Sequence, residues 1–355
     1  MFKINKLNIK RGKILGLTAL LTVGIMAAMT SCASSESSGL DKGASLAVDE
    51  SGLKVINVGL PMSGTDLSIE AITPANASGI LAEELEKAGY KLNAVGFGSG
   101  GTAVNEALAS GQVDLAFMGD VPEVIAASNG VDIQAFASLN SASNLGVLVA
   151  KDSGIKSITD LKGKKVVIAF GTVIHKYLND VLKANGLSLD DVEIINDIAN
   201  AGTLLASGDA DAVVSTAVGI YSYQGAGIGD IIDISLGKPE LAAQFFAVGR
   251  KDFLEANPEA AKAIIKALIR SREWSKDNLD KFYESFATDS VSAEVYKSVY
   301  PSDTDFDYFD PQITDESVRK LKELSTFLLD NGITTKEADI DSFVNTSYYD
   351  EAVKE

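Results

Sequence analysis

Two glycine-rich segments carry residue types that can hold an oxyanion. Each segment follows an expected strand and opens an expected helix. The residues are Ser99, Gly100, Gly101 and Thr102 in the first segment, and Gly171, Thr172 and His175 in the second. A helix start offers free N–H groups and a partial positive charge, and glycine lets the backbone approach a ligand closely. Thr102 and Thr172 also suit plain helix capping, so both roles stay open on the residues alone.

Polar side chains near the ends of other expected strands are further candidates for ligand contact. They are Ser63, Thr65, Asp120, Asn144 at an expected crossover, Thr216 and Tyr221. Ligands in open α/β sheets bind beyond the carboxyl ends of the strands, where these residues are expected. Asp120 and Glu123 have the spacing of a capping box, which favours capping as the role of Asp120. Tyr221 and Tyr223 could line a pocket or lie half-buried at the surface.

The same glycines permit a second interpretation, a dinucleotide site. Gly96 to Gly101 read G-x-G-x-x-G after a strand and before a helix, and Asp120 lies 19 positions after Gly101. An acid that binds ribose belongs near that place. Because the motif does not follow the first strand of its domain, a Rossmann-type oxidoreductase is the less favoured alternative. The sequence has no G-x-S-x-G segment, which argues against a serine hydrolase.

His175 is the only histidine of the chain, and Cys32 is its only cysteine. A metal site of the zinc type needs several such ligands, so His175 cannot build one with other imidazoles or with a free thiol. It could cap an anion, lie in a hinge or simply pack as a polar side chain. We expect neither a metal nor a cofactor.

The elements that must position these residues alternate between strand and helix, which is typical of parallel α/β sheets. Strands are expected at 54–60, 92–95, 113–118, 133–139, 145–150, 165–169, 192–195, 212–215 and 245–248. Helices are expected at 75–88, 102–110, 157–161, 173–184, 202–207, 258–276 and 315–329, with another starting at Gly119-Asp120. The segments 109–114 and 206–211 resemble each other at a helix–glycine–strand joint, which indicates a repeated unit.

The charge of the chain excludes two classes of partner. The formal net charge is −18 over 355 residues. The first 31 residues carry five basic groups and no acid, so the rest of the chain carries −23, which is −18 less these five positive charges. Such a surface repels nucleic acid and anionic lipid headgroups. It also repels anionic ligands at long range, so an anion site must act locally through backbone N–H groups.

The N-terminus has the pattern of an export signal. Five basic residues precede an apolar run at 14–28, and Cys32 follows within Met29–Ala33. This segment resembles a bacterial lipobox, which predicts a signal peptide at 1–31 and a lipid on Cys32. The alternative is an ordinary signal peptide with an incidental cysteine. A Ser-rich tether is expected at 32–52, and one cysteine alone allows no disulfide within the chain.

Four stretches, taken in order, resemble the solute-binding proteins of nitrate, sulfonate and taurine importers. They are 106–130, 146–192, 245–278 and 339–353. The resemblance implies a two-lobed, type II periplasmic-binding-protein-like α/β fold. Each lobe would be a mainly parallel sheet flanked by helices, with two crossing strands as the hinge. Lobe 1 would comprise 53–143 and 241–355, and lobe 2 would comprise 144–240.

The resemblance also implies a function. The chain would be an extracytoplasmic, monomeric binding protein and not an enzyme. It would close on a sulfonate, taurine, nitrate or a related anion and deliver it to an ABC transporter permease. The family pattern of Gly, then Ser or Thr, then His matches Gly171, Thr172 and His175, and it favours a ligand role for Thr172. The chain has no Trp-x-Pro at 216–220, so a thiamine-precursor pyrimidine or another heteroaromatic solute is the alternative.

Overall fold

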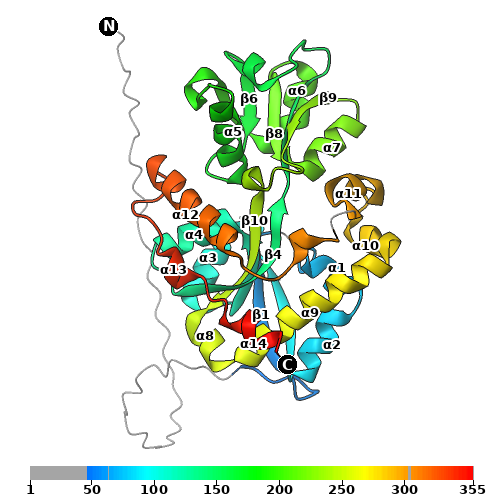
Figure 1. The fold of residues 1–355 in the computed structure, drawn as a ribbon, viewed down its shortest axis with the longest axis vertical. Coiled ribbons are helices and arrows are strands. Elements are labelled where there is room, and N and C mark those ends of the chain that lie inside the picture. Colours follow the sequence, from blue (N-terminus) through cyan, green and yellow to red (C-terminus); the bar gives the residue numbers. More distant parts are fainter. Residues whose placement is uncertain (1–45, 63, 303–304, 355) are drawn as a thin grey trace, which may run out of the picture. The chain divides into compact units, whose positions relative to one another are not determined.

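The computed structural model describes residues 46–62, 64–302 and 305–354, and it consists of two α/β lobes (Figure 1). The expected signal peptide, Cys32, Ser63 and most of the tether lie outside the described residues. No helix in the described ranges combines the length and the apolar character that a bilayer crossing needs.

The sheet of lobe 1 has the strand order β2-β1-β3-β10-β4. Its strands are β1 (Lys54–Leu60), β2 (Tyr90–Gly96), β3 (Leu115–Gly119), β4 (Ile133–Ser143) and β10 (Ala243–Arg250). β1 is parallel to β2 and β3, whereas β10 runs antiparallel to both β3 and β4. The sheet is therefore mainly parallel, with one reversed strand.

The sheet of lobe 2 has the order β7-β6-β8-β5-β9. Its strands are β5 (Leu145–Ala150), β6 (Lys165–Ile168), β7 (Glu193–Asn196), β8 (Ala212–Thr216) and β9 (Gly229–Ile234). Here β5 is the reversed strand, antiparallel to β8 and β9. The two sheets share one topology with one antiparallel strand each, which agrees with the repeated unit expected from the sequence.

Helices cover both faces of the lobe 1 sheet (Figure 1). One face packs on α1 (Ile72–Ala77), α2 (Ile80–Lys87), α9 (Pro258–Asp277), α10 (Leu279–Phe286), α11 (Ala293–Val299) and α14 (Ser347–Ala352). The other packs on α3 (Gly101–Ser110), α4 (Asp120–Ser128), α12 (Asp315–Asp330) and α13 (Ile340–Phe343). Leu115 and Phe117 of β3 point into the first layer, and Ala116 and Met118 into the second. Burial on both faces explains why this strand is almost wholly apolar.

The remaining helices are short or belong to lobe 2. They are α5 (Val173–Ala184), α6 (Ala201–Ser207), α7 (Ala217–Gly225) and α8 (Lys251–Ala256), with 3-10 turns η1 (Ile158–Leu161), η2 (Leu189–Asp191), η3 (Ile198–Asn200), η4 (Pro239–Leu241) and η6 (Asp307–Phe309). One expectation is corrected, and one strand was missed. The helix expected at 75–88 is two helices, because Gly79 adopts a φ of 77° between them. Strand β9 was not expected at all.

Two segments connect the lobes. The chain passes from β4 through Asn144 into β5, and it returns through η4 into β10. Glu70, with a φ of 44°, anchors the first connection to lobe 1. Its carboxylate accepts hydrogen bonds from Asn140 Nδ2 at 2.8 Å and from Ser143 Oγ at 3.1 Å, both on β4. The Tyr300 hydroxyl donates a third bond at 2.7 Å, and burial raises the pKa of Glu70.

Candidate functional site

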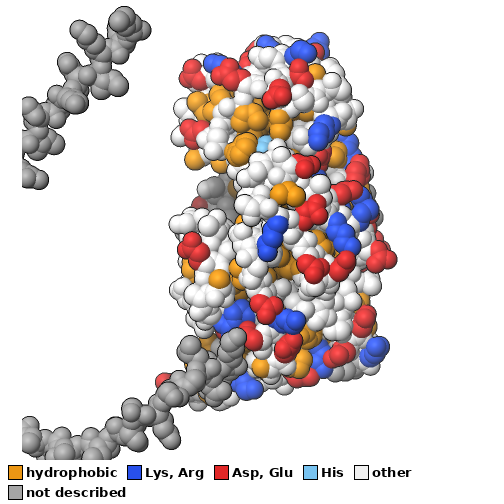
Figure 2. All heavy atoms as spheres, turned by 90° about the vertical axis from the view of Figure 1, so that its left-hand side faces the viewer, with side chains coloured by type: hydrophobic (Ala, Val, Ile, Leu, Met, Phe, Trp, Pro, Cys, Tyr) orange, Lys and Arg blue, Asp and Glu red, His pale blue; other side chains and the backbone are white. Residues whose placement is uncertain are grey.

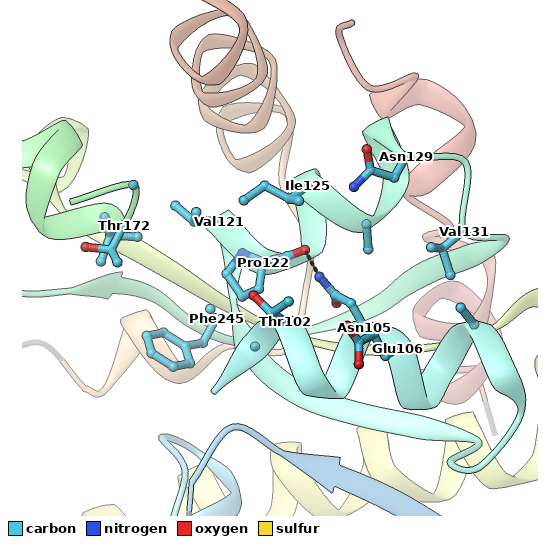
Figure 3. Close-up of a pocket in the computed structure, with 16 residues that line it drawn as sticks. Thr102, Asn105, Glu106, Val121, Pro122, Ile125, Asn129, Val131, Thr172 and Phe245 are labelled. Carbon is cyan, nitrogen blue, oxygen red and sulfur yellow. Dashed lines mark hydrogen bonds between the residues drawn. The ribbon is translucent and has the colours of Figure 1, made fainter. Parts of the chain in front are cut away.

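The N-termini of three helices line one cavity of about 450 Å³ (Figure 3). Gly101 and Thr102 come from α3, Gly119, Val121 and Pro122 from α4, and Gly171, Thr172 and Val173 from α5. The first N–H groups of a helix have no partner inside it, and the helix dipole makes them partly positive. Since α3 and α4 belong to lobe 1 and α5 to lobe 2, both lobes contribute to this cavity.

Apolar side chains form most of the cavity wall. Val121, Ile125 and Val131 line it from the α4 side, and Phe245 closes it from the crossing strand β10. Among the described residues that line the cavity there is no lysine or arginine, and Glu106 is the only charged side chain. An anion in this cavity must therefore be held by N–H and O–H donors.

Close packing holds α3 against α4 at the cavity. A Cβ added to Gly101 would lie 2.4 Å from the Pro122 Cβ, so only glycine fits there. The Asn105 Nδ2 donates a 2.8 Å hydrogen bond to the Pro122 carbonyl oxygen (Figure 3). Gly100 has φ 79° and ψ −161°, which is open essentially to glycine alone and turns the chain from β2 into α3. The glycines of this segment thus serve the geometry of the helix start.

Thr172 and Thr102 differ in their local roles. Thr172 is the N-cap of α5, where its Oγ1 accepts from Ile174 N at 3.2 Å and donates to the Ala169 carbonyl oxygen at 2.7 Å. Its hydroxyl is thus engaged within the protein. The capping role considered for Thr102 is wrong, because Gly100 is the N-cap of α3. Thr102 is exposed and lines the cavity from the first turn.

Asp120 does not form the capping box expected from its spacing with Glu123. Gly119 is the N-cap of α4 and, as a glycine, has no side chain that could cap this helix. Asp120 Oδ2 instead accepts a 3.0 Å hydrogen bond from Gln244 N on β10, and burial raises its pKa to about 6. Glu123 is fully buried, and neither of its carboxylate oxygens has a hydrogen-bond partner among the described residues. Burial raises its pKa well above the ordinary value.

The position of Asp120 also weakens the dinucleotide interpretation. The glycine-rich segment does lie between β2 and α3, but β2 is an edge strand of the sheet. Asp120 is only 6% exposed and bonded to Gln244, so its carboxylate is not placed to meet a ribose.

His175 is buried and does not line the cavity. Its ring stacks on Phe170 at 4.2 Å between centroids and meets the edge of Phe327, on α12 of lobe 1, at 5.4 Å. Its Nδ1 accepts a long 3.4 Å hydrogen bond from Gly171 N. Burial lowers its pKa. The pale blue of His175 lies among hydrophobic side chains in Figure 2.

The structure brings four of the expected site residues to the cavity and places the others elsewhere. Gly101, Thr102, Gly171 and Thr172 line it. Ser99 and Thr65 are exposed outside the lining, and Gly100 directly precedes it. Asn144 accepts from Ser235 Oγ at 3.0 Å beside a different cavity, Thr216 caps α7, and Tyr221 packs on the apolar cluster of lobe 1. Ser63 lies outside the described residues.

Sequence reasoning missed the apolar wall. In β10, a register shift between Phe245 and Phe246 breaks the regular alternation of the strand, so the two adjacent phenylalanines do not indicate that Phe245 lines the cavity. Val121 and Ile125 do carry a signal, since they are spaced four residues apart on α4 and face the same side of the helix.

The two sheets, each with one reversed strand and joined by two connections, define the class of two-lobed periplasmic-binding-protein folds. The chain also matches the model of the NMT1/THI5-like family over residues 85–280. It belongs to that family.

Three known proteins of this kind are similar to the chain. A protein of Bacillus subtilis (strain 168), named as an aliphatic sulfonates-binding protein, is 25% identical over 314 residues, which is 86% of this chain and 90% of the relative. The taurine-binding periplasmic protein of Escherichia coli (strain K12) is 32% identical over 179 residues, 49% of this chain and 54% of the relative. The structure of a periplasmic sulfonate-binding protein from Methylobacillus flagellatus KT matches with a TM-score of 0.73 at 26% identity, covering 85% of this chain and 94% of that one.

Proposed function

We propose that this chain is the extracytoplasmic binding protein of an ABC importer, and that it captures a sulfonate or a closely related anion between its lobes. The observation that carries the proposal is the convergence of the α3, α4 and α5 N-termini on one cavity whose described lining has no basic side chain. Backbone donors at helix ends suit an oxyanion. The names of the similar proteins support the same ligand class.

A sulfonate fits this donor arrangement in charge and in shape. Its single negative charge is delocalised over three oxygens, which can share donors from the α3 and α5 starts. The α4 start adds its dipole but few free donors, because Pro122 has no N–H and the Val121 N–H bonds the Asp120 carboxylate. Thr102 adds a hydroxyl donor from α3, and N–H groups of Thr172 and Val173 add donors from α5. The strongly acidic surface outside the cavity does not attract an anion, so binding depends on close contacts inside the cavity.

Capture by closure follows from the division of the site between lobes. In an open form, an anion would bind the α3 and α4 starts of lobe 1. Closure by bending at the β4–β5 and η4–β10 connections would add the α5 start and exclude water, which strengthens each polar contact. The closed form would then be the one that a permease recognises.

The proposal includes attachment and the absence of catalysis. A lipid on Cys32 would hold the protein, as a monomer, at the outer face of a bacterial membrane beside its permease. Among the described residues of the cavity lining, Glu106 is the only titratable group. A single exposed carboxylate without a paired base or nucleophile suits binding better than reaction.

Isothermal titration of purified protein with methanesulfonate, taurine, nitrate and a thiamine-related pyrimidine tests the proposal. Saturable binding of a sulfonate, with weaker binding by the Thr102→Val variant and recovery in Thr102→Ser, is the expected result. Binding of the pyrimidine alone would replace the anion with the heteroaromatic alternative. Thermal unfolding gives a second readout, since a ligand at about 100 times its dissociation constant adds roughly 2.7 kcal/mol.

A further inference from the structure

A second and much smaller cavity lies between the lobes. Its volume is about 20 Å³, and Val173 lines both this cavity and the candidate site. Lobe 2 contributes one face of α5, at positions spaced three or four residues apart, which include Val173, Lys176, Tyr177 and Asp180. A space of this size accepts one group as large as a water molecule. An ammonium group has that size, so the cavity can take the head of one lysine.

Lobe 1 contributes a buried carboxylate to the small cavity. Asp120 is the first residue of α4 and is 6% exposed. Its Oδ2 accepts the hydrogen bond from Gln244 N, whereas its Oδ1 is buried without a hydrogen-bond partner among the residues that the structure describes. A buried oxygen without a donor is costly, so a donor that reaches Oδ1 stabilises the fold.

Two lysines act on this carboxylate from opposite lobes. Burial raises the pKa of Asp120, and the ammonium groups of Lys320 and Lys176 oppose that rise. The Lys320 ammonium donates to two backbone carbonyl oxygens, which fix its position. The Lys176 ammonium pairs with Asp180 on its own helix, where the two side chains are 23% and 26% exposed. A partly exposed pair of this kind contributes little, so Lys176 can leave it at small cost.

The other acidic group that faces Asp120 does not compete for the ammonium. Glu123 is fully buried, and burial together with the charge of Asp120 raises its pKa well above the ordinary value. Glu123 therefore stays protonated near neutral pH, and Asp120 is the anion that a cation in the small cavity meets.

We propose that the ammonium group of Lys176 leaves Asp180, enters the small cavity and donates to Asp120 Oδ1. The four-carbon stem of lysine is flexible, so rotation of this side chain can make the change. The exchange favours Asp120, because the carboxylate of Asp120 is already desolvated, whereas water screens the pair with Asp180.

The exchanged ion pair crosses from lobe 2 to lobe 1 beside the candidate site. Asp120 directly precedes Val121, and Lys176 lies one turn after Val173, and both valines line the candidate site. Lys176 is therefore a positioning residue, which holds the α5 start against the α4 start. Its part in retaining a solute rests on the proposed function, whereas the ion pair itself does not.

Carbon-13 NMR titration of the Asp120 carboxyl group in the full chain tests the ion pair without any solute. Lys176→Met keeps the apolar stem and removes the ammonium, so Asp120 should titrate about one pH unit higher than in the wild type, a tenfold gain in proton affinity. Lys183→Met is the matched control, because Lys183 is exposed on the same helix and does not line the small cavity. A shift in Lys176→Met no larger than the shift in Lys183→Met would overturn the proposal.

A double-mutant cycle gives an independent test. Asp120→Asn keeps an acceptor for Gln244 N but removes the charge, and it is combined with Lys176→Met. Urea unfolding at pH 7.5 should show that the two effects are not additive, with a coupling of roughly fivefold in the folding equilibrium constant. The same cycle with Lys183→Met in place of Lys176→Met should be additive. Additivity in both cycles would show that Lys176 does not reach Asp120.

The release of methanesulfonate tests the positioning role. Lys176→Met should release this anion about tenfold faster than the wild type, with association changed less than about twofold, because the lost ion pair holds the lobes together after capture. Equal release rates, with the ion pair supported by the titration, would remove the positioning role and leave the pair. If methanesulfonate does not bind at all, the proposed function fails, and the titration and the cycle still decide the ion pair.

Discussion

The ammonium group of Lys320 donates a 2.7 Å hydrogen bond to the carbonyl oxygen of Ala242. Lys320 belongs to α12 of lobe 1, whereas Ala242 directly precedes β10, where the chain returns from lobe 2. The same ammonium group donates to the Pro239 carbonyl oxygen at 2.7 Å. Lys320 is only 9% exposed, and burial lowers its pKa to about 8. One buried cation therefore fastens α12 to one of the two connections between the lobes.

Replacing Lys320 with methionine should destabilise the protein. The change keeps the apolar stem but leaves two carbonyl oxygens without their donor, which costs about 1–3 kcal/mol. Urea unfolding followed by circular dichroism measures this as a lower midpoint. Lys322→Met is the control, because Lys322 is exposed on the same helix and forms a surface ion pair with the exposed Asp341. Equal midpoints for the two variants would show that the Lys320 bonds contribute nothing.

Thr172→Val should lower stability through the loss of a helix cap. Thr172 Oγ1 accepts from Ile174 N and donates to the Ala169 carbonyl oxygen, and valine keeps the shape but offers neither bond. The expected loss is about 0.5–2 kcal/mol in the free energy of unfolding. Thr172→Ser keeps the hydroxyl and should restore most of it. Thermal unfolding of both variants without ligand is the measurement, and a Ser variant as unstable as the Val variant would contradict the capping role.

Glu123→Gln should flatten the dependence of stability on pH. The folded-state pKa of Glu123 is raised, so its contribution to stability is fully present below the unfolded value of 4.5 and is lost as the pH rises towards the folded value. Within that window the wild-type free energy of unfolding should fall by up to about 1.4 kcal/mol per pH unit relative to the variant. Urea titrations from pH 4 to pH 8 measure the difference. Glu86→Gln, at an exposed position of α2, should change nothing.

Most strands could be predicted because their signals are local, whereas the two lobes were expected from the resemblance and from one internal repeat. The strand at Lys54–Leu60 and the helix at Val173–Ala184 were expected with the bounds that the structure has, since apolar periodicity and flanking glycines mark both. β9 was missed because Gly229–Ile234 is a half-buried edge strand with two acids and a glycine, which give it little strand character.

The candidate site was only partly predictable, for a different physical reason. Helix starts can be read from glycines and threonines, and this placed Gly101 and Thr172 correctly at helix N-termini. Which side chains share a cavity depends on how α3 meets α4 and on the approach of α5 from the other lobe. Those contacts join distant parts of the chain, so nothing in the sequence indicates that Phe245 lies in the same cavity as Val121. The spacing of Asp120 and Glu123 suggested a cap, but burial against β10 and α12 decides their environment.

The ring of His175 joins the lobes, because it stacks on Phe170 of lobe 2 and meets the edge of Phe327 on lobe 1. Its Nε2 is buried and has no hydrogen-bond partner in the part of the chain that the structure describes. Burial disfavours the protonated ring, so its folded-state pKa is lower than the unfolded value of 6.5. The contribution of neutral His175 to stability is present above pH 6.5. It is lost as the pH falls through the folded-state pKa of the ring. The raised pKa of Asp120 acts in the opposite direction over about pH 4 to 6, so a variant must isolate the contribution of His175.

His175→Phe should remove this loss on acidification while it keeps an aromatic ring between Phe170 and Phe327. The free energy of unfolding of the variant, minus that of the wild type, should rise as the pH falls below 6.5, and it should be constant between pH 7 and 8. Taking this difference cancels Asp120 and the other carboxyl groups, which are unchanged in both proteins. His175→Gln is the second variant, since it also removes the titration but lacks the ring. It should give the same pH trend from a lower overall stability. Parallel curves for the wild type and both variants below pH 6.5 would show that protonation of His175 does not change the free energy of unfolding.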